Sequence, residues 1–135
     1  MSADVPPDGP SQPIDTSAAP SPGIVFACFD PWGRQIVLTE HRWRQHILLG
    51  HPALFDAEEI ARDVLASPWG VMYDAKYADR ESFYGFGRLP APHDHLWLKV
   101  CVGFRLTGEG AVLGNVITAY PTPKIKSGER IKWRR

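Results

Sequence analysis

Four short runs of β-forming residues decide the fold, namely GVMYD (residues 70–74), SFYGFG (82–87), HLWLKVCVGF (95–104) and AVLGNVITAY (111–120). Turn-forming segments that contain Gly, Pro or Asp separate these runs, which is typical of successive strands. Residues two apart in a strand share a face, so Lys99 and Cys101 lie together, as do Thr118 and Tyr120. Polar groups on otherwise apolar strands indicate a functional site.

Upstream of these runs, the sequence predicts a β-hairpin. Residues 24–29 and 34–38 are rich in β-forming residues and flank the turn DPWG (30–33). The proline of this turn presets one dihedral angle, and the glycine accepts a positive φ.

Two amphipathic helices are expected between the hairpin and the later strands. Thr39 is expected to cap the first helix, which ends at Gly50. Asp56, with Glu59 three residues later, is expected to start the second, which ends before Pro68. This order predicts an α+β fold, with the N-terminal hairpin and two helices on one face of a four-stranded or larger antiparallel sheet. The other face of the sheet is expected to stay open.

The length of 135 residues fits one domain, and 15 Lys+Arg balance 15 Asp+Glu. Residues 1–22 contain six prolines and little that can be buried, which predicts a disordered arm before a single domain over residues 23–135. The last twelve residues hold six basic residues and one acid. Neither an apolar run of about 20 residues nor a secretory signal is visible, so a cytoplasmic protein without membrane contact is expected.

The sequence carries no strong metal pattern. Cys28 and Cys101 stand far apart in apolar stretches, which favours free core thiols over a disulfide or a zinc site. His93 and His95 could bind a metal, but they follow a Pro-rich turn, and a solvated loop is the favoured interpretation. We therefore expect neither a metal nor another cofactor.

The densest chemical signal is the segment HRWRQHILLGHP (residues 41–52). His41, His46 and His51 follow at steps of five, which are about 140° apart on an α-helix, so they are poor joint ligands for a metal. His46, three residues after Trp43, is expected at the edge of the buried face, where an imidazole can transfer protons near neutral pH. The alternatives are a histidine bonded to a backbone carbonyl and, for His51, a cap between helices.

Cationic and hydroxyl groups lie on or beside the predicted strands. Arg80 and Lys99 can hold a phosphate and stabilise charge on a pentacoordinate phosphorus, while Tyr84, Thr118 and Tyr120 add hydroxyl groups. Singly, such residues are more often simple surface groups.

The basic C-terminal end offers a second means of contact with nucleic acid. Lys124 and Lys126 can contact a phosphate backbone, and Trp133 can stack on a base. A solvated basic tail is the alternative interpretation.

The order of these pieces carries a resemblance. DPWGRQIVLT (residues 30–39) is followed by Arg42-Trp43, His46-Ile47, His51-Pro52 and finally VITAY (116–120). This order resembles the phage-barnase-EndoU-colicin-RelE-like nuclease families, most closely the branch numbered two, over about residues 29–133. Two departures from the family pattern are Gln45, which lengthens the gap between Trp43 and His46, and Ala53, which stands where an acid often follows His-Pro.

The resemblance implies a small α+β domain with helices packed on an antiparallel sheet, and a set of site residues. His46 would act as general base or acid, Arg80 and Lys99 would stabilise the phosphorane, and Thr118 would position the phosphate. His51 and Tyr120 are motif positions that would bind substrate, and Tyr84 is added from its place in the pattern. Lys124, Lys126 and Trp133 of the basic end complete the expected substrate-binding residues.

The resemblance also implies an activity. We expect a metal-independent endoribonuclease of toxin or mobile-element settings that cleaves RNA by attack of the 2′-hydroxyl, leaving a 2′,3′-cyclic phosphate. The expected partners are RNA and an antitoxin or immunity protein. One alternative is a non-catalytic RNA- or protein-binding module on the same fold. A weaker one is a metal-dependent hydrolase that uses His93 and His95.

Overall fold

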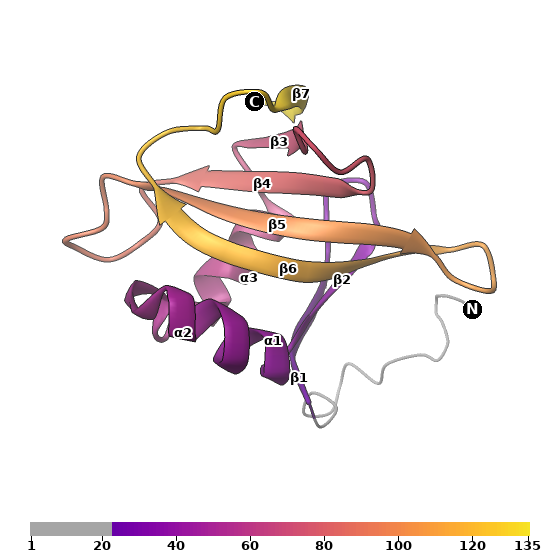
Figure 1. Ribbon diagram of the computed structural model, residues 1–135, viewed down its shortest axis with the longest axis horizontal. Coiled ribbons are helices and arrows are strands. Elements are labelled where there is room, and N and C mark those ends of the chain that lie inside the picture. Colours follow the sequence, from indigo (N-terminus) through magenta and orange to yellow (C-terminus); the bar gives the residue numbers. More distant parts are fainter. Residues whose placement is uncertain (1–22) are drawn as a thin grey trace.

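A mixed β-sheet in the order β1-β2-β6-β5-β4-β3-β7 forms the centre of the computed structural model, which describes residues 23–135 (Figure 1). The strands are β1 (Ile24–Phe29), β2 (Gln35–Thr39), β3 (Gly70–Tyr73), β4 (Arg80–Phe86), β5 (Trp97–Leu106), β6 (Val112–Thr122) and β7 (Arg130–Arg134). With three helices and further short turns, they confirm the α+β class. The arm expected over residues 1–22 lies outside the described residues.

The N-terminal hairpin forms as predicted but extends the sheet instead of packing on it. β1 and β2 pair antiparallel, and Gly33 in their turn has a φ of 78°. β2 then pairs in parallel with β6, with Ile36 opposite Gly114. Gly114 is required there, because an added Cβ would lie 2.8 Å from the Phe104 ring and 3.1 Å from the Ile36 side chain. This parallel pair was not expected, because local patterns do not show which distant strand edge will be paired.

The first predicted helix forms over residues 40–50 but contains a π-helical turn. It consists of α1 (Glu40–Arg42), η1 (Trp43–Ile47) and α2 (Leu48–Gly50). The predicted cap is confirmed, since Thr39 Oγ1 accepts a hydrogen bond of 3.1 Å from the Arg42 backbone N–H. A π turn adds one residue to a helical turn. This turn contains Gln45, which lies between Trp43 and His46.

The second predicted helix begins later than expected. After the 3-10 turn η2 (Pro52–Leu54), α3 (Glu58–Ala66) has Ala57 at its cap position and no side-chain cap. Asp56 is not the cap: its φ of 63° is left-handed, a conformation that Asp tolerates better than most residues. The chain therefore reverses at Asp56 before the helix starts. In the described part of the chain, no helix is long and apolar enough to cross a membrane.

The core lies between one face of the curved sheet and the helices. α3 packs on β1, β4 and β5. The largest fully buried side chains on this side include Phe83, Ile36, Leu38, Ile47, Leu54 and Leu65. Cys28 and Cys101 are buried and free, as predicted. Burial raises the pKa of Cys28 to about 12 and also raises the pKa of Cys101, so both are neutral thiols at pH 7.

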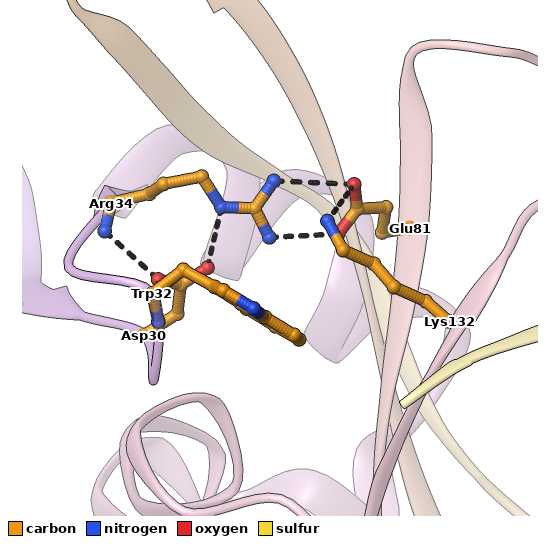
Figure 2. Close-up of polar contacts among 5 residues, drawn as sticks. All are labelled: Asp30, Trp32, Arg34, Glu81 and Lys132. Carbon is orange, nitrogen blue, oxygen red and sulfur yellow. Dashed lines mark hydrogen bonds and ion pairs between the residues drawn. The ribbon is translucent and has the colours of Figure 1, made fainter. Parts of the chain in front are cut away.

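The turn between β1 and β2 reaches across to β7, although these strands lie at opposite ends of the strand order. The Trp32 and Trp133 rings are 6.2 Å apart and nearly perpendicular, and Lys132 Nζ lies 4.5 Å from the Trp32 ring centroid. The sheet must curl for these residues to meet. Figure 2 shows the polar side chains that fill this end of the core.

Arg34 is the centre of this polar group (Figure 2). Its Nε donates to Asp30 Oδ2 at 2.7 Å, and its two Nη groups donate to the Glu81 carboxylate at 2.7 and 3.2 Å. Lys132 Nζ donates to Glu81 Oε2 at 2.9 Å. Burial alone would raise the pKa of Glu81, but the bonds from Arg34 and Lys132 lower it below the ordinary value of 4.5. Glu81 on β4 therefore binds the turn and β7 together.

This network predicts a loss of stability in acid. Because the pKa of Glu81 is lower in the folded state than in the unfolded state, its contribution is present above pH 4.5 and is lost as the pH falls through the folded-state pKa. Glu81→Gln should lower the free energy of unfolding by about 3 kcal/mol at pH 7 and flatten this acid slope. Urea titrations from neutral to acidic pH measure both effects. Glu59→Gln is the control, since its carboxylate is exposed, and an equal effect of both substitutions would contradict the role of Glu81.

The contact of α3 with the sheet predicts a second effect on stability. A Cβ added at Gly85 would lie 2.7 Å from Val64 Cγ2 of α3, whereas one added at Gly108 would meet nothing within 4 Å. Gly85→Ala should therefore lower the free energy of unfolding by about 1–3 kcal/mol through overpacking. Gly108→Ala should change it little or increase it slightly. Equal denaturation midpoints for the two variants would show that α3 does not pack this closely.

Candidate functional site

Four of the predicted site residues come together on the face of the sheet opposite the core. Tyr84 on β4, Lys99 on β5 and Tyr120 on β6 are direct cross-strand neighbours. Thr118 follows in the next row, opposite Cys101. Alternation groups Thr118 with Tyr120, as the sequence pattern indicated, and the strand pairing brings Tyr84 and Lys99 to the same face.

This face was expected to stay open, but here the connection from β6 to β7 covers it. We call residues 123–129 the strap; in Figure 1 the connection arches from the end of β6 past β4 and β3. The Lys126 backbone N–H donates to Tyr84 Oη at 3.4 Å. Tyr84 is 0% exposed and Lys99 only 4%. The local pattern could not show this cover, because the strap comes from a distant part of the chain.

Glu129 at the end of the strap inserts its carboxylate between two of the predicted residues. Lys99 Nζ donates to Oε2 at 2.7 Å, and Tyr84 Oη donates to Oε1 at 2.6 Å. The Glu129 side chain is 0% exposed. Lys99 thus has a buried counterion within the protein.

The protonation of this group follows from its contacts. Burial alone would lower the pKa of Lys99, but its contacts with Glu129, Tyr120 and Tyr84 together outweigh burial and raise the pKa well above the ordinary value of 10.5. Burial raises the pKa of Tyr84, and its bond to Glu129 raises it further. At neutral pH, Lys99 is therefore a cation and Tyr84 a neutral hydrogen-bond donor.

His51 joins this row from the helical side of the molecule. Its ring stacks on that of Tyr120, with centroids 5.3 Å apart and planes inclined by 29°. Lys99 Nζ lies 5.5 Å from the Tyr120 ring centroid. His51, Tyr120 and Thr118 are each half-buried, so solvent reaches this end of the row. The row offers an imidazole, two hydroxyl groups and a buried cation close together.

His46 lies elsewhere and is exposed. Its ring packs edge-on against His41, with centroids 5.4 Å apart. The π turn has more residues per turn than an α-helix, which brings these two histidines side by side. His51 instead stacks on Tyr120, so the three histidines do not come together.

The remaining predicted residues are spread around the sheet. The Arg80 guanidinium lies 4.2 Å from the Tyr77 ring centroid. Lys124 and Lys126 are exposed on the strap. Trp133 is half-buried against the core and lies in β7, which pairs with β3. The basic end is therefore a strand of the sheet and not a solvated tail.

Sequence reasoning missed two features of this face. Glu129 was counted only as the single acid of a basic end, and nothing in its local sequence indicates burial. An aromatic cluster lies beside Tyr84: the Trp97 ring is 5.0 Å from both Trp69 and Phe86 and 6.2 Å from Tyr84. The alternation of Trp97 with Lys99 on one strand was the available signal for this cluster.

Within residues 23–135, no three His, Cys, Asp or Glu side chains come together as a metal site. His93 and His95 lie in the loop between β4 and β5, where His93 is half-buried and His95 exposed.

The buried pair of Lys99 and Glu129 predicts a coupled loss of stability. Glu129→Gln leaves the Lys99 ammonium without its counterion, so the free energy of unfolding should fall by about 3 kcal/mol. Adding Lys99→Met should recover part of that loss, because it removes the uncompensated charge. Chemical denaturation of both single variants and the double variant measures the coupling. Glu109→Gln, at an exposed position, is the control, and strictly additive losses would contradict a direct pair.

In comparisons with protein-family models, with curated proteins and with solved structures, the chain matched none.

Proposed function

We propose that this protein is a metal-independent endoribonuclease. The observation that carries the proposal is the stack of His51 on Tyr120, beside Thr118 and above the buried Lys99. Imidazole is the side chain most suited to proton transfer at neutral pH, and hydroxyl groups can bind phosphate oxygens. The resemblance to the barnase-, EndoU- and RelE-like nucleases supports the same class of reaction. We propose that the α+β fold is of their type, with helices on one face of a mainly antiparallel sheet.

The reaction would be transphosphorylation of RNA. The ribose 2′-oxygen attacks the adjacent phosphorus and loses its proton to a base. The bond from phosphorus to the 5′-oxygen breaks, that oxygen takes up a proton, and a 2′,3′-cyclic phosphate remains. His51 fills one of the two proton-transfer roles, and Thr118 donates a hydrogen bond to a phosphate oxygen.

The geometry favours a revised division of roles. His51 takes the role that the resemblance gave to His46, because His51 contacts the row of site residues while His46 is exposed beside His41. Lys99 is bonded to Glu129, so it acts as a positioning residue that helps to fix the Tyr120 ring, whose centroid lies 5.5 Å from Lys99 Nζ. The Arg80 guanidinium lies over the Tyr77 ring, and its proposed role is to bind the RNA outside the reacting phosphate.

The proposed partners follow from the exposed groups. Lys124 and Lys126 on the strap contact RNA phosphates, since both are exposed near Tyr84 and Tyr120. An antitoxin or immunity protein would bind over the same row and exclude RNA. The proposed setting is the cytoplasm, where RNA is available.

The test is incubation of the purified protein with total cellular RNA in excess EDTA, followed by analysis of the fragment ends. The wild type should leave cyclic-phosphate ends. His51→Ala should reduce the cleavage rate about 100-fold or more, the usual size of a general acid or base contribution. His46→Ala is the matched control and should keep most of the activity.

Two outcomes would overturn this assignment. Full cleavage by folded His51→Ala protein would remove His51 from the reaction, and loss of cleavage in His46→Ala alone would return the role to His46. Cleavage that disappears in EDTA and returns with a divalent metal would instead favour the hydrolase with His93 and His95.

A second candidate function is a non-catalytic RNA-binding module on the same fold. The bond between Lys99 and Glu129 favours it, because the buried cation is already neutralised within the protein. This module would bind RNA with salt-sensitive affinity and without turnover. Truncation after residue 123 cannot test it, since that removes Glu129 and the whole of β7.

Charge removal on the strap tests this module instead. Lys124→Ala with Lys126→Ala should weaken RNA binding and reduce the slope of log affinity against log salt by about 1.4, or about 0.7 for each phosphate that is no longer neutralised. Ala substitution of Arg62 and Lys76, exposed cations outside the strap, is the control. An unchanged slope in the strap variant would exclude these lysines from the interface.

A further inference from the structure

An exposed aromatic surface lies beside the row of site residues, on the same face of the sheet. We call Trp69, Phe86 and Trp97 the aromatic platform. Trp97 precedes Lys99 by two residues on β5, a distance of about 7 Å along a strand. Phe86 on β4 is its cross-strand neighbour. The platform therefore forms the row next to that of Tyr84 and Lys99, on the side away from Thr118.

The platform is exposed to solvent, whereas the neighbouring row with Tyr84 and Lys99 is covered by the strap. Phe86 is 53% exposed, and Trp69 and Trp97 are half-buried, whereas Tyr84 two residues away is fully buried. The rings of Phe86 and Trp97 meet at 65°, close to edge-to-face. In such a pair one ring offers only its edge, so an outer ring face stays available for a third aromatic group.

Cations flank the platform on two sides. The Arg88 guanidinium donates to the Ser67 carbonyl at 3.0 Å, and the Arg135 guanidinium donates to Ser67 Oγ at 2.7 Å and to the carbonyl of Pro68, the residue before Trp69, at 3.1 Å. On the other side, Lys124 follows Thr122, the cross-strand neighbour of Trp97. Arg88, Arg135 and Lys124 are all exposed, as is Asp94, an acid of the β4–β5 loop. The summed charge of these four side chains is positive.

We propose that the aromatic platform binds an unpaired base of single-stranded RNA by stacking, beyond the covered row that separates it from the phosphate held at Thr118 and His51. Stacking accepts any base, because every base has a π face, while the flanking cations attract the phosphates on either side. Bases inside a duplex are already stacked and cannot enter. This inference rests on the proposed function and adds to it a substrate class, single-stranded RNA, and the residues that select it.

The test measures binding without cleavage. A fluorescent 2′-O-methyl oligonucleotide is the probe, because it lacks the attacking 2′-hydroxyl, and anisotropy reports its affinity. Phe86→Ala should weaken binding of the single strand roughly 5- to 100-fold, the range for loss of one stacked base. Phe86→Trp should restore it. The matched control is Phe55→Ala, which removes a phenyl ring that is 72% exposed outside the platform.

The outcomes separate this inference from the proposed function. Equal affinity of wild type and Phe86→Ala for the single strand, equal losses in Phe86→Ala and Phe55→Ala, or no binding by the wild type would overturn the stacking site. Equal sensitivity of a duplex probe to Phe86→Ala would overturn the selection of single strands. Binding that depends on Phe86, without cleavage of natural RNA, would sustain the stacking site and reject the nuclease. If cleavage depends on His51 but RNA binding is unchanged in Phe86→Ala, the nuclease is supported and the stacking site is rejected.

Discussion

The buried ion pair between Lys99 and Glu129 is the contact on which the arrangement of the site depends. It joins the first half of β5 to the end of the strap, directly before β7 begins. A lysine on a sheet face needs a counterion once water is excluded. Glu129 is that counterion, and its bond to Lys99 holds the strap across the face. Tyr84 donates to the same carboxylate and is buried with it. The pair thus accounts for both the cover over the sheet and the position of the last strand.

This arrangement divides one sheet face into three parts. The covered part contains Tyr84 and Lys99, whose charge is balanced inside the protein. On one side of it, the stack of His51 on Tyr120 reaches solvent. On the other side, the aromatic platform is open, with Phe86 as its most exposed ring. Proton transfer and base stacking can then occur at neighbouring positions, while the buried ion pair holds the strands between them in place.

Much of the local structure could be predicted from the sequence, because it depends on near neighbours in the chain. The turn with Gly33, the Thr39 cap and the strands with alternating residues all formed as expected. One local prediction was wrong: Asp56 adopts a left-handed conformation and does not cap the second helix. The π turn, which the local sequence did not indicate, brings His41 and His46 side by side.

For the site, the sequence determined which chemical groups are present and, within one strand, which of them share a face: period-two alternation placed Thr118 with Tyr120. The strand register then brought Tyr84 and Lys99 to the same face. Only the tertiary structure decided which of these groups have partners. Glu129 reaches Lys99 across 30 residues of chain, and His51 reaches Tyr120 across 69. Alternation of apolar and polar residues indicates which face of a strand a side chain occupies. Burial, ion pairing and contacts between distant strands depend instead on how the whole sheet curls.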